Sequence, residues 1–381
     1  MNILRLRALR LLLPLLGLSS ELCLAQLPAR SPKPDDNVKS VEVLPDNRVI
    51  FSIYAPKASE VKVSGDFLLG APPAQLTKND AGIWSFTSPP VPPDSYTYNF
   101  NVDGVNTLDT RSATFKENPN ALFNYFDMDR PETAFMALKN VPHGRVEKVL
   151  YHSRSLDAER RLHVYLPPGF EKLRGKLPVL YLLHGGGDND ISWTSAGKAN
   201  LVLDNLYAEG KLKSMIVVMP SGHTAKQGNS MGTGPDQDPF CTDLLQDIIP
   251  FVEKTYPVST KLEHRAIAGF SMGGIQTLNT ALWHPELFGY VCPMGTGFFP
   301  ASIKELEEKQ SAVLKNPAIN QLKLLLIGRG KDDTLTAKNN QAMLELFDRA
   351  GVKYQYQELP GGHSFVFTRR YLAFVAPKLF R

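Results

Sequence analysis

Short runs that alternate apolar and polar residues fill the stretch from residue 41 to residue 128. This alternation is typical of half-buried strands, and turn-forming pairs such as Asp103-Gly104 separate the runs. No helical period interrupts them. The pattern therefore predicts a small β-sandwich, with its clearest strands at 49–54, 60–64, 82–87 and 95–102.

The pattern changes after a connector at 129–145, which contains Pro131, Pro142 and Gly144. From residue 146 to residue 381, near-continuous apolar runs alternate with stretches of helical period. Strands that are apolar on both faces are typical of a parallel sheet covered by helices on both sides, so this region predicts a doubly wound, mostly parallel α/β domain. Its strands are expected at 179–183, 215–219, 265–268, 289–292, 322–327 and 354–358, and its helices at 199–209, 241–255, 272–283, 302–314 and 335–350.

The first residues, 1–26, have the features of a cleaved signal peptide. A basic start precedes a short apolar run at 11–18, and Cys23 and Ala25 are the small residues expected before a cut. The run is too short to span a bilayer, although an uncleaved N-terminal anchor is the alternative. Export predicts a periplasmic or extracellular protein, with a flexible leader at 27–40 that is rich in Pro, Ser, Lys and Asp.

The composition of the 381 residues, 43% hydrophobic and 21% charged, is that of a globular protein with a packed core. A formal net charge of +4 is small for this length and gives no reason to expect nucleic acid or an acidic membrane as a partner. No membrane span is expected once the signal is removed. Cys241 and Cys292 could pair after export, but Cys292 lies in an apolar run and is expected as a buried thiol.

A five-residue segment, Gly269-Phe-Ser-Met-Gly273, lies between an expected strand and an expected helix. This is the context of the nucleophile elbow of the α/β-hydrolase fold, a strained turn that exposes a serine hydroxyl above the sheet. The turn is so tight that its flanking positions must lack a Cβ atom, which Gly269 and Gly273 provide. Ser271 is therefore the expected nucleophile, and the alternative is a plain glycine turn.

A nucleophilic serine requires a base, and in the α/β-hydrolase fold the histidine comes last in the chain, after the last strand. His363 lies in a glycine-rich segment just beyond the strand expected at 354–358. The third group must hold the imidazole in the correct tautomer and should follow the preceding strand. Asp332 and Asp333 are adjacent at that place, and position alone leaves both open.

Acyl transfer also requires two backbone N–H donors for the oxyanion. One is expected at Met272, the residue after the serine. The other is expected in the loop His184-Gly-Gly-Gly187, directly after the strand at 179–183, because glycine lets the backbone approach a substrate closely. No cofactor is expected, since the sequence has no metal-binding His or Cys pattern and its glycines lack the spacing of nucleotide-binding loops.

Aromatic residues near these loops are candidates for the walls of an acyl pocket. Phe298 and Phe299 follow the strand expected at 289–292, and Trp193 follows the glycine-rich loop. Loops beyond the carboxyl ends of parallel strands border the crevice of a doubly wound sheet, and an aromatic acyl group needs flat apolar walls. The alternative is that these rings only cover the sheet.

Segments of the first region resemble the early-set sandwich that is related to glycogen-binding modules, which implies an immunoglobulin-like fold for residues 41–128. Such modules carry an Asn-Trp pair soon after Gly-Asp-Phe, where this chain has Leu68-Leu-Gly70. Trp84 is expected to be a core residue of the sandwich, and a platform for a sugar ring is the alternative. The segments that carry the resemblance are 63–67, 82–84, 93–98 and 102–104.

The second region, from residue 146 to residue 381, resembles the esterase D and feruloyl esterase group, which is carbohydrate esterase family one. In that group the acid is the third residue after a glycine, as in Gly330-Lys-Asp-Asp333, which favours Asp333. The loop donor of the group is the residue after the His-Gly pair, which implies Gly186. The segments that carry the resemblance are 182–187, 219–223, 247–253, 269–274, 284–288 and 360–363.

Members of that group with an early-set sandwich ahead of the esterase are often exported enzymes that remove feruloyl or acetyl groups from plant xylan. The resemblance therefore implies a secreted serine esterase that acts on an acylated plant polysaccharide or oligosaccharide. Two alternatives stay open. Ferric-enterobactin esterases share a similar two-domain plan, and a non-catalytic glycan-binding protein could retain the hydrolase fold.

Overall fold

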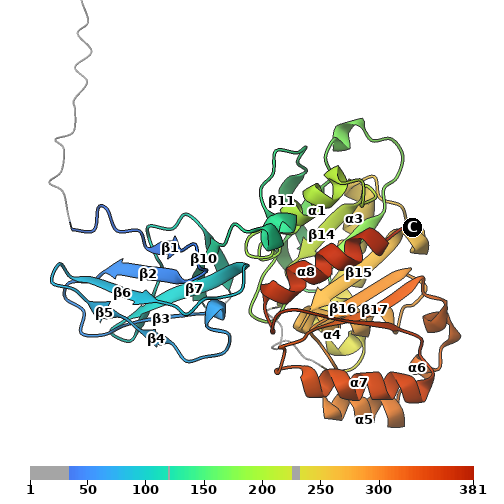
Figure 1. The fold of residues 1–381 in the computed structure, drawn as a ribbon. Helices are drawn as coiled ribbons and strands as arrows, with labels where there is room; N and C mark the ends of the chain where they lie inside the picture. The colour runs from blue at the N-terminus through green and yellow to red at the C-terminus, as the bar shows by residue number, and fades with distance from the viewer. Residues whose placement is uncertain (1–33, 119–120, 225–231) are drawn as a thin grey trace, which may run out of the picture.

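The computed structural model describes residues 34–118, 121–224 and 232–381 (Figure 1). The expected signal peptide at 1–26, and most of the expected leader at 27–40, lie outside the described residues. Within the described ranges, no helix is long and apolar enough to cross a bilayer.

The N-terminal part of the described chain is a sandwich of antiparallel strands (Figure 1). Its buried core is rich in aromatic rings, and the rings of Phe51 and Phe67 stack with centroids 4.4 Å apart. One sheet joins β1 (Val41–Val43), β2 (Val49–Tyr54), β6 (Ile83–Thr87) and β5 (Thr77–Lys78) in that order. The other joins β4 (Ala74–Gln75), β3 (Val61–Gly65), β7 (Ser95–Val102), β10 (Ala121–Asp127) and β9 (Phe115–Asn118), with β8 (Val105–Thr107) also paired to β7.

Trp84 lies in the core of this sandwich. Its side chain is buried, and its indole N–H donates to the carbonyl of Ala55 at 2.9 Å. A buried ring with a satisfied N–H has no free face for a sugar, so the structure supports the interpretation of Trp84 as a core residue.

The C-terminal part is built on one sheet, which has eight strands among the described residues. Its first two strands form an antiparallel hairpin, and from the third strand onward neighbouring strands run parallel. The predicted mostly parallel sheet is therefore confirmed. The order is β11 (Arg145–Ser153), β12 (Ala158–Leu166), β14 (Ile216–Pro220), β13 (Val179–Leu183), β15 (Arg265–Phe270), β16 (Tyr290–Met294), β17 (Leu324–Gly330) and β18 (Gln355–Leu359).

Helices cover both faces of this sheet, and each face has its own hydrophobic cluster. One face is covered by α1 (Ala199–Ala208) and α8 (Phe365–Val375), which lie across the sheet in Figure 1. The other is covered by α2 (Pro239–Asp243), α3 (Ile249–Thr255), α4 (Met272–Ala281), α5 (Pro300–Glu308), α6 (Ser311–Leu314) and α7 (Ala337–Ala350). This double cover explains why the central strands are apolar on both faces. It is the α/β-hydrolase arrangement that the sequence predicts.

In the hydrolase part, the sequence analysis did not predict the hairpin of β11 and β12 or the helix α8. Strand β11 is an edge strand with exposed residues along most of its length, so it lacks the continuous apolar run of the central strands. Helix α8 begins two residues after His363, in a stretch for which the sequence analysis predicted no element. Cys241 and Cys292 are both buried free thiols, as expected for Cys292.

Candidate active site

Ser271 occupies the turn between β15 and α4. Its backbone has φ 55° and ψ −113°, a conformation that is costly for a residue with a side chain. A Cβ atom at Gly269 would lie 2.1 Å from the carbonyl oxygen of Gly273, and one at Gly273 would lie 2.5 Å from that of His184. Both flanking positions therefore require glycine, and the tight turn holds the serine in its strained conformation.

His363 and Asp333 complete a hydrogen-bonded series with Ser271. The Nε2 atom of His363 lies 2.9 Å from the Ser271 hydroxyl, and its Nδ1 atom lies 2.8 Å from Oδ2 of Asp333. The loop after β18 carries the histidine, and the loop after β17 carries the aspartate. A hydroxyl, an imidazole and a carboxylate in this order can activate the hydroxyl as a nucleophile.

The two adjacent aspartates have different surroundings. Asp333 is 1% exposed and accepts hydrogen bonds from the backbone N–H and the hydroxyl of Thr336 at 3.0 and 2.7 Å. Burial raises the pKa of Asp333, but the hydrogen bond and charge of His363 and the Thr336 bonds outweigh it, so its pKa lies below the usual range. Asp332 is exposed, and its Oδ2 atom accepts a hydrogen bond from the backbone N–H of Gly361 at 3.4 Å. The geometry therefore favours Asp333 as the partner of the histidine.

The expected oxyanion donors lie next to each other. Met272 begins α4, and a Cβ atom at Gly186 would lie 3.9 Å from the Cβ atom of Met272. The loop that carries Gly186 follows β13, and the N–H of Gly273 bonds to the carbonyl of His184 at 3.1 Å. That bond fastens the glycine loop to the first turn of the helix beside Ser271.

The imidazole ring of His184 forms hydrogen bonds with the glycine loop and with the neighbouring Gly222. The N–H of Gly222 donates to its Nε2 atom at 2.8 Å, so its Nδ1 atom carries the proton and donates to the carbonyl of Gly185 at 2.8 Å. Burial lowers the pKa of His184 to about 4. The ring therefore stays neutral near pH 7 and keeps an acceptor for Gly222.

Comparisons with known proteins agree with this geometry. Residues 153–373 match the Esterase family model, described as "Putative esterase". The chain belongs to this esterase family. It is a carboxylic ester hydrolase with the α/β-hydrolase fold. Residues 39–121 match the model of carbohydrate-binding module 48, the isoamylase N-terminal domain.

Three known proteins are similar to this chain over much of its length. The chain is 32% identical to an endo-1,4-β-xylanase/feruloyl esterase of Xylanibacter ruminicola over 87% of its own length. It spans only 44% of the length of that relative. It is 25% identical to a ferulic acid esterase structure, with a TM-score of 0.54 over 63% of this chain and 98% of that one. The enterobactin esterase of Shigella flexneri shares its fold over 87% of this chain and 92% of that one, with 17% identity and a TM-score of 0.67.

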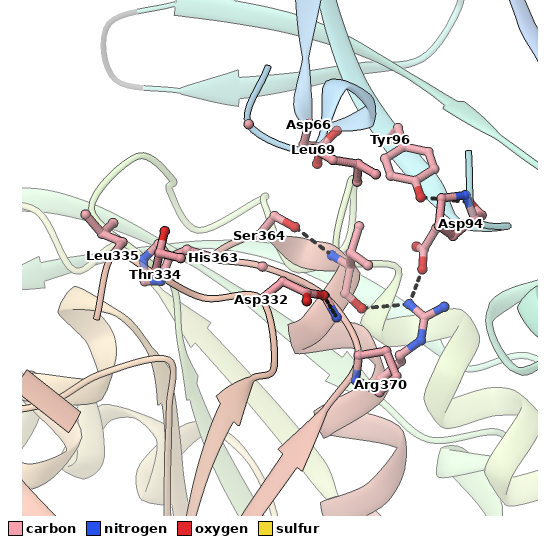
Figure 2. A pocket seen from close by; sticks show the side chains of 16 residues that line it. Asp66, Leu69, Asp94, Tyr96, Asp332, Thr334, Leu335, His363, Ser364 and Arg370 are labelled. Carbon is pink, nitrogen blue, oxygen red and sulfur yellow. Dashed lines mark hydrogen bonds and ion pairs between the residues drawn. The ribbon is translucent and has the colours of Figure 1, made fainter. Parts of the chain in front are cut away.

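Two cavities of the esterase meet at His363, and both are lined by residues from the sandwich and from the hydrolase part. The first, of about 650 Å³, has Asp66, Leu69 and Tyr96 on one side and Leu335 and His363 on the other (Figure 2). The second, of about 470 Å³, contains Ser271 and the glycine loop. Sandwich residues also line this second cavity, namely Asp66, Thr97, Lys116 and Phe123.

Asp66 is the acidic group that these cavities share. Its carboxylate accepts a hydrogen bond from the backbone N–H of Thr97 at 2.6 Å. Burial raises the pKa of Asp66 to about 6, against the lowering effect of the positive charges of Arg369 and Lys116. The sequence analysis missed Asp66, Lys116 and Phe123, because no local pattern in the sandwich indicates that this edge faces the serine.

None of the three aromatic residues expected as walls of the acyl pocket lines either of these two cavities. Trp193 and Phe298 are each 1% exposed and belong to the core. Trp193 packs edge-on against Phe365 with centroids 5.4 Å apart, and Phe298 packs against Phe347 of α7 with centroids 6.5 Å apart. Phe299, at 36% exposed, lies before α5 and does not line either cavity of the described structure. Rings that follow a strand can turn into the helix layer, and these two do.

Proposed function

We propose that this esterase removes feruloyl or acetyl groups from plant xylan, outside the cytoplasm, through an acyl-enzyme on Ser271. The observation that carries the proposal is the hydrogen-bonded series of Ser271, His363 and Asp333 beside a cavity. Serine esters form and break by this arrangement in unrelated folds, so the mechanism follows from geometry and roles.

The first half of the reaction forms the acyl-enzyme. The Ser271 hydroxyl attacks the ester carbonyl while Nε2 of His363 takes its proton. The negative oxygen of the tetrahedral intermediate accepts hydrogen bonds from the backbone N–H groups of Gly186 and Met272. The intermediate then expels the sugar alkoxide, which receives the proton from His363 and leaves as an alcohol.

The second half repeats these steps with water. His363 takes a proton from a water molecule, whose oxygen attacks the acyl carbon. Collapse of the second intermediate returns the proton to Ser271 and releases the carboxylic acid. Asp333 holds Nδ1–H of the imidazole throughout and stabilises the imidazolium, and its lowered pKa keeps it ionised in this role.

Three observations support the substrate class. The relative from Xylanibacter ruminicola, at 32% identity, is named an endo-1,4-β-xylanase/feruloyl esterase. The cavity beside His363 has apolar side chains at its rim, among them Leu69 and Leu335, both largely exposed. Apolar walls suit the ring of a hydroxycinnamoyl group, and the module-48 match suits a glycan partner.

A panel of three esters tests this substrate class. Purified protein is assayed with methyl ferulate, acetylated xylan and a catechol siderophore ester. The proposal predicts a higher kcat/KM on the feruloyl or the acetylxylan ester than on the siderophore ester. A preference for the siderophore ester would transfer the function to siderophore hydrolysis, and no turnover of any ester would favour a glycan-binding protein without catalysis.

A further inference from the structure

The hairpin of β9 and β10 brings a sandwich lysine to the glycine loop of the esterase. Nζ of Lys116 lies 2.6 Å from Oδ1 of Asp188, and the two side chains are only 14% and 5% exposed. The same Nζ atom lies 5.2 Å from the ring centroid of Phe365, just beyond the loop of His363. The cation is therefore held between the two loops that flank Ser271.

Asp188 links this cation to the backbone of the loop. Its Oδ2 atom accepts a hydrogen bond from the N–H of Gly185 at 3.2 Å, and its own N–H donates to the carbonyl of Gly185 at 3.1 Å. A Cβ atom at Gly185 would lie 3.1 Å from Oδ2 of Asp188 and 2.9 Å from the ring of Phe270. Gly186 is the next residue, so the hydrogen bonds between Gly185 and Asp188 restrain the backbone on its N-terminal side.

We infer that Lys116 is a positioning residue for the oxyanion donor, acting through Asp188 from the other domain. The inference rests on the proposed role of the Gly186 N–H. A buried carboxylate is stable in its ionised form only when it is paired. Without the lysine, the Asp188 carboxylate loses its charged partner and is free to turn toward water, and the N–H of Gly185 then loses its acceptor. The N–H of Gly186 then loses the orientation that the oxyanion requires.

The test removes the Lys116 cation by substitution and compares the result with removal of the cation from a second ion pair between the two domains. Lys198 offers the control, because its Nζ atom pairs across the same two domains with Asp127 of the sandwich at 2.6 Å and lies 5.6 Å from the ring centroid of Tyr125. We expect Lys116→Met to lower kcat on methyl ferulate roughly tenfold with little change in KM, less than the 10²–10³ that loss of an oxyanion donor costs. Lys198→Met should keep the kcat of the natural protein.

Two readouts separate positioning from a general loss of structure. Affinity for an aryl boronic acid, whose tetrahedral adduct with serine offers an oxygen to the oxyanion donors, should fall by the same factor as kcat. Affinity for the product ferulate should not change. Lys116→Arg, which keeps the charge beside Asp188, should recover most of the kcat. If Lys116→Met does not fold, the same comparison is made with Lys116→Gln.

A double-mutant cycle with Asp188→Asn tests the route through the carboxylate. If Lys116 acts through Asp188, adding Lys116→Met to Asp188→Asn should lower kcat no further. Additive losses would mean that the lysine acts independently of Asp188, and they would overturn the inference, as would equal kcat for Lys116→Met and Lys198→Met. If the natural protein hydrolyses none of the esters, the proposed function has failed and not this inference.

Discussion

At the scale of single residues, the environment decides a role that sequence position leaves open. Asp332 and Asp333 are neighbours in the chain, and both follow a strand that precedes the histidine. The resemblance to the esterase group favours Asp333, and the structure supplies the physical reason. Only Asp333 is buried, bonded to Thr336 and within 2.8 Å of His363. The contact with His363 joins residues 30 positions apart in the sequence, so no local pattern could reveal it.

This difference predicts unequal effects of two conservative substitutions. Asp333→Asn should lower kcat on methyl ferulate by about ten-thousandfold, because an amide favours the wrong imidazole tautomer. Asp332→Asn is the matched control and should change kcat little, since its side chain is exposed. The measurement is kcat for both variants on the same ester. A larger loss for Asp332→Asn would transfer the acid role to Asp332.

At the scale of elements, most strands of the parallel sheet follow from the sequence because burial on both faces leaves a continuous apolar run, and most helices follow from their helical period. The strand expected at 179–183 is β13 at the same residues, and the helix expected at 335–350 is α7 at Ala337–Ala350. The sequence does not predict the direction in which a side chain points after a strand, because that direction depends on the packing of the neighbouring helices. Phe298 illustrates this, since its ring packs under α7 and not in the cavity.

The hairpin of β9 and β10 offers a better aromatic candidate for the acyl group. Phe123 lines the cavity of Ser271, while Phe115, on the opposite face of the same hairpin, is 51% exposed. Phe123→Ala should raise KM for a feruloyl ester more than for an acetyl ester, by a factor that corresponds to about 0.5–1.5 kcal/mol for a lost ring contact. Phe115→Ala is the control, with both KM values expected to stay unchanged. Equal changes for both esters in Phe123→Ala would mean that this ring supports the fold only.

At the scale of the whole molecule, a buried carboxylate fastens the sandwich to the hydrolase part. Asp94 pairs with Arg369 of α8 at 2.5 Å and also with Arg370, and the side chains of Asp94 and Arg369 are each 1% exposed. Arg369 further donates to the carbonyls of Ser95 and Ala196. The sequence predicts both domains but not this contact, because the partners are separated by 275 residues. The contact fixes the sandwich edge that lines the cavity.

Removing this carboxylate should therefore affect stability. Asp94→Ala leaves two guanidinium groups without their buried partner, and we expect a loss of about 3–5 kcal/mol in the free energy of unfolding. Asp46→Ala, which removes an exposed pair with Arg48 in the same sandwich, should lower the free energy of unfolding far less, because solvent screens an exposed ion pair. Urea unfolding followed by tryptophan fluorescence measures both. Similar losses for the two variants would show that the Asp94 contact does not hold the domains together.

The central claim is that Ser271 is the nucleophile of ester hydrolysis, and the most direct measurement is the turnover of methyl ferulate by Ser271→Ala. The account predicts that kcat falls on the order of a millionfold, the typical cost of removing a triad nucleophile. It also predicts an unchanged circular dichroism spectrum and urea midpoint, because alanine removes only the hydroxyl. Turnover within a few fold of the natural protein, with the fold intact, would contradict the account.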